Sequence, residues 1–256
     1  LEVGEWIFIG TYGSGLFKIN KITDEIITFN DINSDLPSNY IRSLLASTNG
    51  NIYVGSGGGL AKFDGINTIG WTIYNISNSD LPGNTVNCLL EGSNGDIYIG
   101  TYEGGLAKFD GINTTGWVIY HIYNSDLQSN IVTTLLESNN GEIFVGTWGG
   151  LVKFDGNSST GWTIYNIGTS DLPHNSILTL LESSNGNVFV GTASGLAKFD
   201  GINTTGWMIY YPANSDYYTN NLDAAQNNYV QYLLEINASD ILVGTTYGLA
   251  KFDGNS

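Results

Sequence analysis

The chain has 256 residues and a net charge of −16, from 24 acidic and 8 basic side chains. A surface of this sign repels nucleic-acid phosphates and anionic lipid headgroups, so we expect neither as a partner. One cysteine excludes an internal disulfide, and no apolar run reaches the length of about 18 residues that insertion into a membrane requires. The 34 glycines and 41% hydrophobic residues are typical of a turn-rich β protein.

One segment recurs six times along the chain, as an apolar triplet, a glycine, a glycine-containing turn and then an apolar stretch with lysine or phenylalanine. The glycine after the triplet falls at Gly10, Gly55, Gly100, Gly146, Gly191 and Gly244. The copies therefore lie about 45 residues apart, and an insertion after Asp216 lengthens the last interval. Because the chain opens inside a repeat and without Met, we expect its start to be a processed or cut end.

Each repeat contains four short strand patterns, which we call A to D in chain order. In the third repeat, the A and B patterns are separated by Asn94-Gly95, a dipeptide suited to a tight hairpin because both residues tolerate positive φ. A glycine loop separates B from C, and a turn around Asp110-Gly111 separates C from D. The strands of this repeat are expected at residues 86–91, 97–99, 106–109 and 117–120.

Four antiparallel strands in a repeat of this length are typical of a β-propeller blade, whose two apolar faces are buried by its neighbours. The sequence predicts an all-β chain that forms a single β-propeller domain over residues 1–256. Six copies of the B–C hairpin indicate six four-stranded blades, with incomplete blades at both ends because complete A and D patterns occur only five times each. A five-bladed ring and a part of a larger ring are the alternatives.

The repeat has the one-letter pattern VxxLLExSNGxIYVGTxxGLAKFDG, followed by GWTIYNxSNSDLPxN. This pattern resembles the two-component regulator propeller repeat over nearly the whole chain, most specifically in the GLxKFDG core and in the loop Ser79-Asp80-Leu81-Pro82. The resemblance implies a bacterial propeller located in the periplasm, at the cell surface or in the extracellular space. It also implies a binding role, as in the sensor parts of hybrid histidine kinases, without naming a ligand.

Candidate binding residues lie on the loops that join B to C and D to the next A. When A is the innermost strand, both kinds of loop emerge on the same side of the blades, which we call the loop face. Flat rings there could stack on sugars or peptide groups, and carboxylates could bind hydroxyls. The candidates are Tyr12, Tyr102, Trp148 and Tyr247 on B–C loops, and Asp35, Asp80, Asp126, Asp171 and Asp216 on D–A loops. Since the aspartates recur in every unit, the alternative is that each closes its own turn.

Three weaker signals accompany these candidates. Lys62 and Asp64, with their counterparts in other repeats, are expected to form a structural pair or turn. Acidic loops could bind Ca²⁺, but each offers only one or two carboxylates, so we expect no cofactor. N-glycosylation motifs begin at Asn75, Asn113, Asn157, Asn203 and Asn237.

No Ser/His/Asp set, metal-spaced His/Cys cluster or phosphate loop is found, so we expect no enzyme activity. The leading interpretation is an extracellular binding or scaffold propeller that recognises a glycan, a peptide or a protein partner on the loop face. One alternative is a structural repeat unit of a surface assembly, since incomplete end blades allow end-to-end self-assembly by strand pairing. The other is a propeller lyase or hydrolase; streptogramin lyase, a similar fold, uses a histidine base, and His121 and His174 are the only histidines here.

Overall fold

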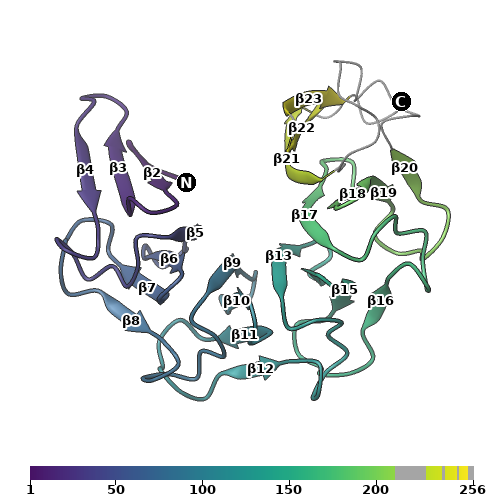
Figure 1. Cartoon of the computed structure of the whole chain (residues 1–256), viewed down its shortest axis with the longest axis horizontal. Helices are drawn as coiled ribbons and strands as arrows, with labels where there is room; N and C mark the ends of the chain where they lie inside the picture. The colour runs from purple at the N-terminus through teal and green to yellow at the C-terminus, as the bar shows by residue number, and fades with distance from the viewer. Residues whose placement is uncertain (211–228, 238–239, 247, 253–256) are drawn as a thin grey trace. The chain divides into compact units, whose positions relative to one another are not determined.

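Figure 1 shows the computed structural model of the chain, which describes residues 1–210, 229–237, 240–246 and 248–252. The regular structure of these residues consists of β-strands in six antiparallel sheets. The first five sheets have four strands each, and the described part of the last has three. Within the described ranges, no helix has the length and apolar character needed to span a membrane.

The sheets follow one another in chain order, and in each sheet every strand pairs with the next one along the chain. The first three sheets consist of β1 (Glu2–Val3), β2 (Trp6–Gly10), β3 (Leu16–Asn20) and β4 (Ile26–Phe29); β5 (Ile41–Ala46), β6 (Ile52–Ser56), β7 (Gly59–Phe63) and β8 (Thr72–Tyr74); and β9 (Val86–Glu91), β10 (Ile97–Thr101), β11 (Leu106–Phe109) and β12 (Val118–Tyr120). The last three consist of β13 (Val132–Glu137), β14 (Ile143–Thr147), β15 (Gly150–Phe154) and β16 (Thr163–Tyr165); β17 (Ile177–Glu182), β18 (Val188–Thr192), β19 (Gly195–Phe199) and β20 (Met208–Tyr210); and β21 (Val230–Asn237), β22 (Asp240–Thr245) and β23 (Gly248–Phe252).

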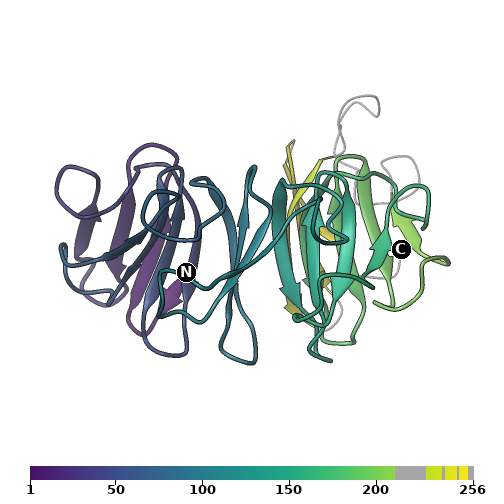
Figure 2. The same cartoon turned by 90° about the horizontal axis from the view of Figure 1, so that it is seen from below.

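The contacts divide the chain into two compact units. Unit 1 comprises Leu1–His121 with Asn130–Val132, and unit 2 comprises Ile122–Ser129 with Thr133–Ser256. Within unit 1, Figure 1 shows β5 and β9 on one side of their sheets and β8 and β12 on the other. Within unit 2, β13 and β17 likewise lie on one side of their sheets, and β16 and β20 lie on the other. The loops of each unit gather at the two ends of its strands (Figure 2).

The B strands are apolar on both faces because a sheet within a unit is covered by its neighbours. Ile97, Tyr98 and Ile99 of β10 are all buried, although a strand exposed on one face would alternate between apolar and polar residues. Gly100 ends this apolar run for a steric reason. A Cβ atom there would lie 2.3 Å from Cys88 Sγ and 2.6 Å from a methyl carbon of Val132, so only glycine lets the strands approach this closely.

Aromatic rings fill the layers between neighbouring sheets. Trp71 stacks on Phe63 with ring centroids 4.1 Å apart, and both rings contact Phe29 of the preceding sheet. The indole Nε1 of Trp71 donates a hydrogen bond to Asn67 O in the C–D loop of the same blade. Trp117, Trp162 and Trp207 repeat the stacking and this hydrogen bond. The recurring tryptophan thus belongs to the core and fastens the outer strand.

The sheets are the blades of a β-propeller, so the all-β class and the six blades are confirmed, and a count of five is wrong. The first blade has four strands, of which β1 has two residues, and three strands are described in the last blade, whose predicted incompleteness stays a prediction. The A, B and C strands expected in the third repeat are found, while the D strand begins one residue later, after Trp117. The insertion after Asp216 lies outside the described residues, and the single domain over residues 1–256 stays a prediction.

Candidate functional site

The B–C and D–A loops lie next to each other, as expected from the order of the strands. In unit 1, Gly13 N donates to Asn39 O at 3.0 Å, and Tyr12 forms an isolated β-bridge with Tyr40. In the third blade, Tyr102 N donates to Thr85 O at 2.9 Å. Unit 2 repeats this arrangement, since Ala193 N donates to the D–A residue Ser176. Each unit therefore has a loop face held together by backbone hydrogen bonds.

Three of the four aromatic candidates can be placed on these loops. Tyr12 is 77% exposed, Tyr102 is 36% exposed and Trp148 is 49% exposed. Tyr12 packs edge-to-face against Tyr40, with ring centroids 4.9 Å apart. Tyr247 lies outside the described residues. The exposed rings offer surfaces for stacking on a ligand, and their role in binding stays a prediction.

The D–A aspartates are engaged within the protein. Asp35 Oδ2 accepts hydrogen bonds from Gly70 N at 2.6 Å and Trp71 N at 3.1 Å, and these donors belong to the C–D loop of the next blade. Asp80, Asp126 and Asp171 repeat this pair of bonds. The expectation that each aspartate closes its own turn is therefore wrong, because the turn it holds lies in the following blade. Asp216 lies outside the described residues.

The recurring lysines also reach the next blade. Lys62 Nζ donates to Gly111 O at 2.9 Å, and Lys18 Nζ donates to Gly65 O at 2.7 Å. Of the expected pair or turn, the pair of Lys62 with Asp64 is not formed, because Lys62 donates to the next blade. Asp64 forms the turn, since its Oδ1 accepts hydrogen bonds from Ile66 N and Asn67 N in its own loop. These backbone donors, that of Asn67 first, hold the pKa of Asp64 below its ordinary value.

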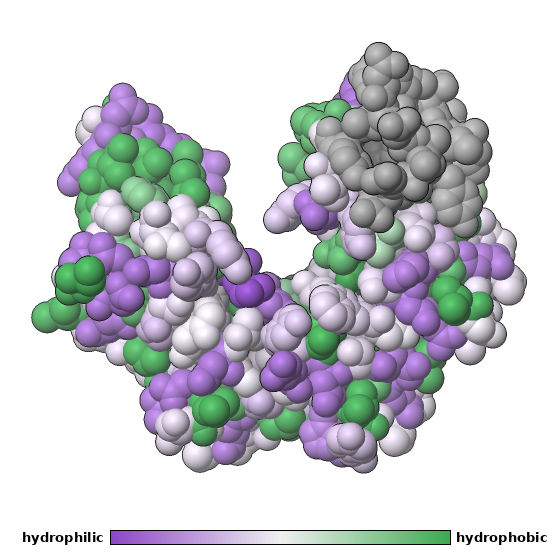
Figure 3. All heavy atoms as spheres, in the orientation of Figure 1, coloured by the Kyte–Doolittle hydropathy of each residue, from purple (hydrophilic) through white to green (hydrophobic). Residues whose placement is uncertain are grey.

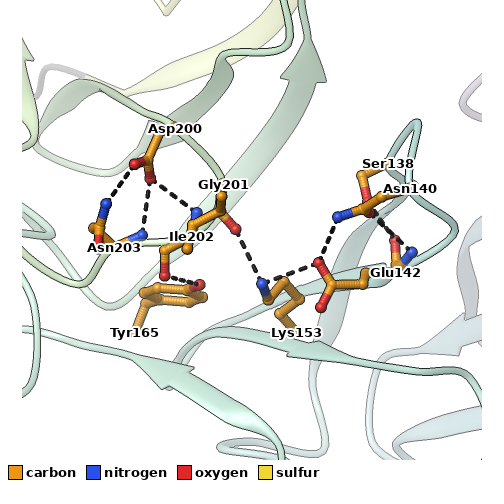
Figure 4. A network of polar contacts seen from close by, with 9 residues as sticks. All are labelled: Ser138, Asn140, Glu142, Lys153, Tyr165, Asp200, Gly201, Ile202 and Asn203. Atoms are coloured by element: carbon orange, nitrogen blue, oxygen red, sulfur yellow. Dashed lines mark hydrogen bonds and ion pairs between the residues drawn. The ribbon is translucent and has the colours of Figure 1, made fainter.

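Figure 4 shows the same contacts between the fourth and fifth blades. Lys153 Nζ lies 3.1 Å from Gly201 O and 3.0 Å from Glu142 Oε2. Asp200 closes its own loop through Ile202 N and Asn203 N, and Tyr165 Oη donates to Ile202 O. Lys153 and Tyr165 therefore join the fourth blade to the fifth, while Glu142 and Asp200 hold groups of their own blade in place.

Cys88 and His174, which could act as a nucleophile or a base, are each engaged within the protein. Burial raises the pKa of the Cys88 thiol to about 12, so the thiol is not ionised near neutral pH. His174 Nδ1 accepts a hydrogen bond from Ser176 N at 2.9 Å, within its own D–A loop. In the described part of the chain, no three His, Cys, Asp or Glu residues are arranged to hold a metal ion.

The glycosylation motifs occupy different environments. Asn113, Asn157 and Asn203 lie on exposed C–D loops. The side-chain amides of Asn113 and Asn203 donate to Asp110 and Asp200, respectively. Asn75 is partly buried at the start of a D–A loop, and Asn237 ends β21. Their glycosylation stays a prediction.

The structure brings two further residues to the loop face of unit 1. Tyr40 ends a D–A loop and packs on Tyr12, and Arg42 lies with its guanidinium carbon 5.9 Å from the centre of the Tyr12 ring. The sequence contained one signal for Arg42, since it is the only arginine of the chain. No pattern distinguished Tyr40, because its place beside Tyr12 follows from the pairing of two loops.

The model of the two component regulator propeller family matches residues 35–58, 80–103 and 171–194 of the chain. The sequence pattern had indicated this family. In a comparison with curated protein sequences, no match was found.

Solved structures share the fold. The extracellular domain of the putative hybrid two component system BT3049 from B. thetaiotaomicron matches with a TM-score of 0.80 and 20% identity, over 98% of this chain and 32% of that chain. PorZ, a surface component of the type-IX secretion system of Porphyromonas gingivalis, matches at 0.72 and 15% identity, over 97% and 37%. A virginiamycin B lyase from Staphylococcus aureus matches at 0.63 and 10% identity, over 94% and 77%. The chain thus spans about a third of the length of the first two.

Proposed function

We propose that this chain, with its two component regulator propeller repeats, is a non-catalytic binding domain that works outside the cytoplasm. Its ligand is a glycan, a peptide or a protein partner, bound on the loop face. The family match and the likeness to the extracellular domain of BT3049 and to the surface protein PorZ support this location and role. Catalysis is not part of the proposal, although the fold is shared with a lyase.

The observation that carries the proposal is a difference between two classes of loop residue. The repeated residues, such as Asp80 and Trp117, form hydrogen bonds between or within blades. The aromatic residues of the B–C loops differ from blade to blade and stay exposed, as Tyr12, Tyr102 and Trp148 do. Features needed for the fold recur in every blade, whereas a binding site requires side chains only where the ligand lies. Exposed aromatic rings that vary among blades therefore suit a ligand site.

The direct test is binding of the intact chain to a glycan array and a peptide array, with Trp148→Ala measured alongside. We expect a specific ligand, and we expect Trp148→Ala or Tyr102→Ala to weaken its binding at least about tenfold, since aromatic anchors dominate such sites. Met208→Ala is the matched control for unit 2. Met208 is 47% exposed, close to the value for Trp148, but it lies on the outer strand β20.

Two results would contradict the proposal. If a ligand binds and the Tyr12, Tyr102 and Trp148 variants all keep wild-type affinity, the loop face is not its site. If neither array yields a ligand, and sedimentation shows assemblies that grow with concentration, the chain is a structural unit. Turnover of an array ligand would overturn the non-catalytic part.

A further inference from the structure

Four Asn-Gly pairs close the hairpins between the A and B strands of the second to fifth blades. They are Asn49-Gly50, Asn94-Gly95, Asn140-Gly141 and Asn185-Gly186. All four asparagines are exposed to solvent, and the φ angles of the four glycines lie between 82° and 85°. A glycine after an asparagine favours loss of the side-chain amide, because a residue without Cβ does not hinder attack by its own backbone nitrogen. The four turns are therefore candidate sites of one reaction, deamidation.

In deamidation, the backbone nitrogen of the glycine gives its proton to hydroxide and attacks the side-chain carbonyl carbon of the asparagine. A carbon–nitrogen bond forms, which closes a cyclic imide, and the bond from that carbon to the side-chain nitrogen breaks. This nitrogen takes a proton from water and leaves as ammonia, which regenerates the hydroxide. A water molecule then opens the imide to aspartate or isoaspartate. Water is the only reagent consumed, and the product carries one more negative charge than asparagine.

The folded hairpin holds both reacting groups. Gly141 N donates to Ser138 O at 2.8 Å, so the nitrogen that must attack is already bonded to a carbonyl. The Asn140 side chain is held as well, since Glu142 N donates to Asn140 Oδ1 at 3.3 Å. The other three turns repeat both bonds. The reaction therefore needs the hairpin to open, and local opening costs less free energy than global unfolding.

The turns differ in what the side-chain nitrogen of the asparagine contacts. Asn140 Nδ2 donates to Glu142 Oε2 at 2.9 Å, and the same Glu142 oxygen lies 3.0 Å from Lys153 Nζ (Figure 4). Lys153 also donates to Gly201 O of the fifth blade. The third blade has the same contacts among Asn94, Asp96 and Lys108. In these two turns, the amide that deamidation removes is a donor to a carboxylate.

In the other two turns, an asparagine stands in place of that carboxylate. Asn187 Nδ2 donates to Asn185 Oδ1 at 2.7 Å, and Ser183 Oγ donates to the same oxygen at 2.7 Å. In the second blade, Asn51 Nδ2 donates to Asn49 Oδ1 at 2.8 Å. These donors bind a carboxylate oxygen at least as well as an amide oxygen, because hydrogen bonds to an ionised acceptor are stronger.

We propose that the four turns form two classes of deamidation site, one in which the product destabilises the fold and one in which it is tolerated. The first class is Asn94 and Asn140, and the second is Asn49 and Asn185. At position 140 the reaction puts a carboxylate where a donor to Glu142 was, and like charges at this distance repel. The repulsion displaces Glu142 from Lys153, which also holds the fifth blade. At position 185 the new carboxylate meets the donors of Asn187 and Ser183.

The consequence is tested with variants of the intact chain that carry the product of the reaction. Asn140→Asp should lower the midpoint of thermal unfolding by about 2 °C or more. Asn185→Asp adds the same charge and should change the midpoint by less than about 1 °C. In a Glu142→Gln background, Asn140→Asp should lose most of its effect, because the carboxylate that faces the new one is gone. Asn94→Asp and Asn49→Asp repeat the comparison in unit 1.

The reaction itself is followed by peptide mass mapping of the wild-type chain in mildly alkaline buffer, with and without urea. In urea we expect all four asparagines to convert to aspartate and isoaspartate. In the folded chain the conversion should be slower by about tenfold or more, because the hairpins must first open. Limited proteolysis of partly converted chains should digest molecules changed at Asn140 before those changed at Asn185.

The inference is overturned if Asn140→Asp and Asn185→Asp shift the midpoint equally, or if Glu142→Gln does not reduce the effect of Asn140→Asp. Equal rates of conversion in the folded chain and in urea would show that the hairpin bonds do not hold the reacting groups. A lack of conversion in urea would remove the sites altogether. These measurements use no ligand, so their outcome leaves the proposed binding role to its own test.

Discussion

At the scale of single residues, the aspartate that opens each C–D loop is the clearest case of a carboxylate used as a local acceptor. Asp64 and its counterparts Asp110, Asp155 and Asp200 each accept backbone hydrogen bonds two and three residues ahead. In all four, these donors hold the pKa of the carboxyl below its ordinary value. The ionised form is therefore favoured in the folded state.

These four carboxyls should contribute to acid unfolding. Because their pKa values are lowered by folding, the stability they add is present above the unfolded pKa and is lost as pH falls through the folded pKa. We expect the free energy of unfolding to drop between about pH 4 and pH 2. A variant with Asn at all four positions should lose less stability over this interval. Urea unfolding across the interval measures this, and parallel curves for the two proteins would contradict the assignment.

Cys88 is half-buried, and its thiol should behave as an apolar group. Its thiol has a pKa raised to about 12 by burial, and its Sγ lies 2.3 Å from the position that a Cβ of Gly100 would take. Since the thiolate is the reactive form, we expect negligible reaction with an aromatic disulfide reagent at about pH 8 in the folded chain. Reaction should become rapid in urea. A fast reaction of the folded protein would show that the thiol is accessible.

At the scale of the elements, the D–A loop is a connection between blades as well as a link in the chain. Asp80 Oδ2 holds Gly116 N at 2.6 Å and also accepts from Trp117 N, just before β12 begins. Its own backbone N–H donates to Thr114 O of the same C–D loop. The loop that precedes a blade thereby determines where the outer strand of that blade starts.

Asp80→Ala should therefore destabilise the third blade without altering its strands. We expect a loss of about 1–3 kcal/mol, the usual cost of leaving backbone donors without a charged acceptor, at the lower end because the carboxylate is exposed. Urea unfolding measures this loss. Glu103→Ala, which removes an exposed B–C loop carboxylate, is the control and should cost less than about 0.5 kcal/mol. Equal effects of the two changes would mean that Asp80 contributes only its charge.

At the scale of the whole molecule, the contacts between blades act against the electrostatic repulsion that comes from a net charge of −16. Surface apolar residues appear in Figure 3 mostly as separate patches among polar ones. Lysines such as Lys62 and Lys153 are used at the contacts between blades, and the whole chain has 24 acidic residues against 8 basic ones. Repulsion among the remaining carboxylates favours expansion of the chain.

Added salt should therefore stabilise the protein. Between about 10 mM and 150 mM NaCl the screening length falls from about 30 Å to about 8 Å, which weakens long-range repulsion but leaves hydrogen bonds at close range. We expect the midpoint of thermal unfolding to rise over this interval at pH 7. A midpoint that falls with salt would mean that attractive ion pairs, such as that of Lys153 with Glu142, outweigh the repulsion.

The amino-acid sequence by itself determined the repeat, the strands, the six blades and the tight turns. These features depend on alternation and turn chemistry within a few residues, as in β10 and at Asn94-Gly95. Only the tertiary structure decided what the repeated polar residues contact. Asp35 reaches a loop 35 residues ahead and Lys62 a carbonyl 49 residues ahead, because neighbouring sheets stack closely. A residue that recurs once per blade has the same spacing whether it faces its own blade or the next. The grouping of Tyr12, Tyr40 and Arg42 likewise follows from the pairing of two loops.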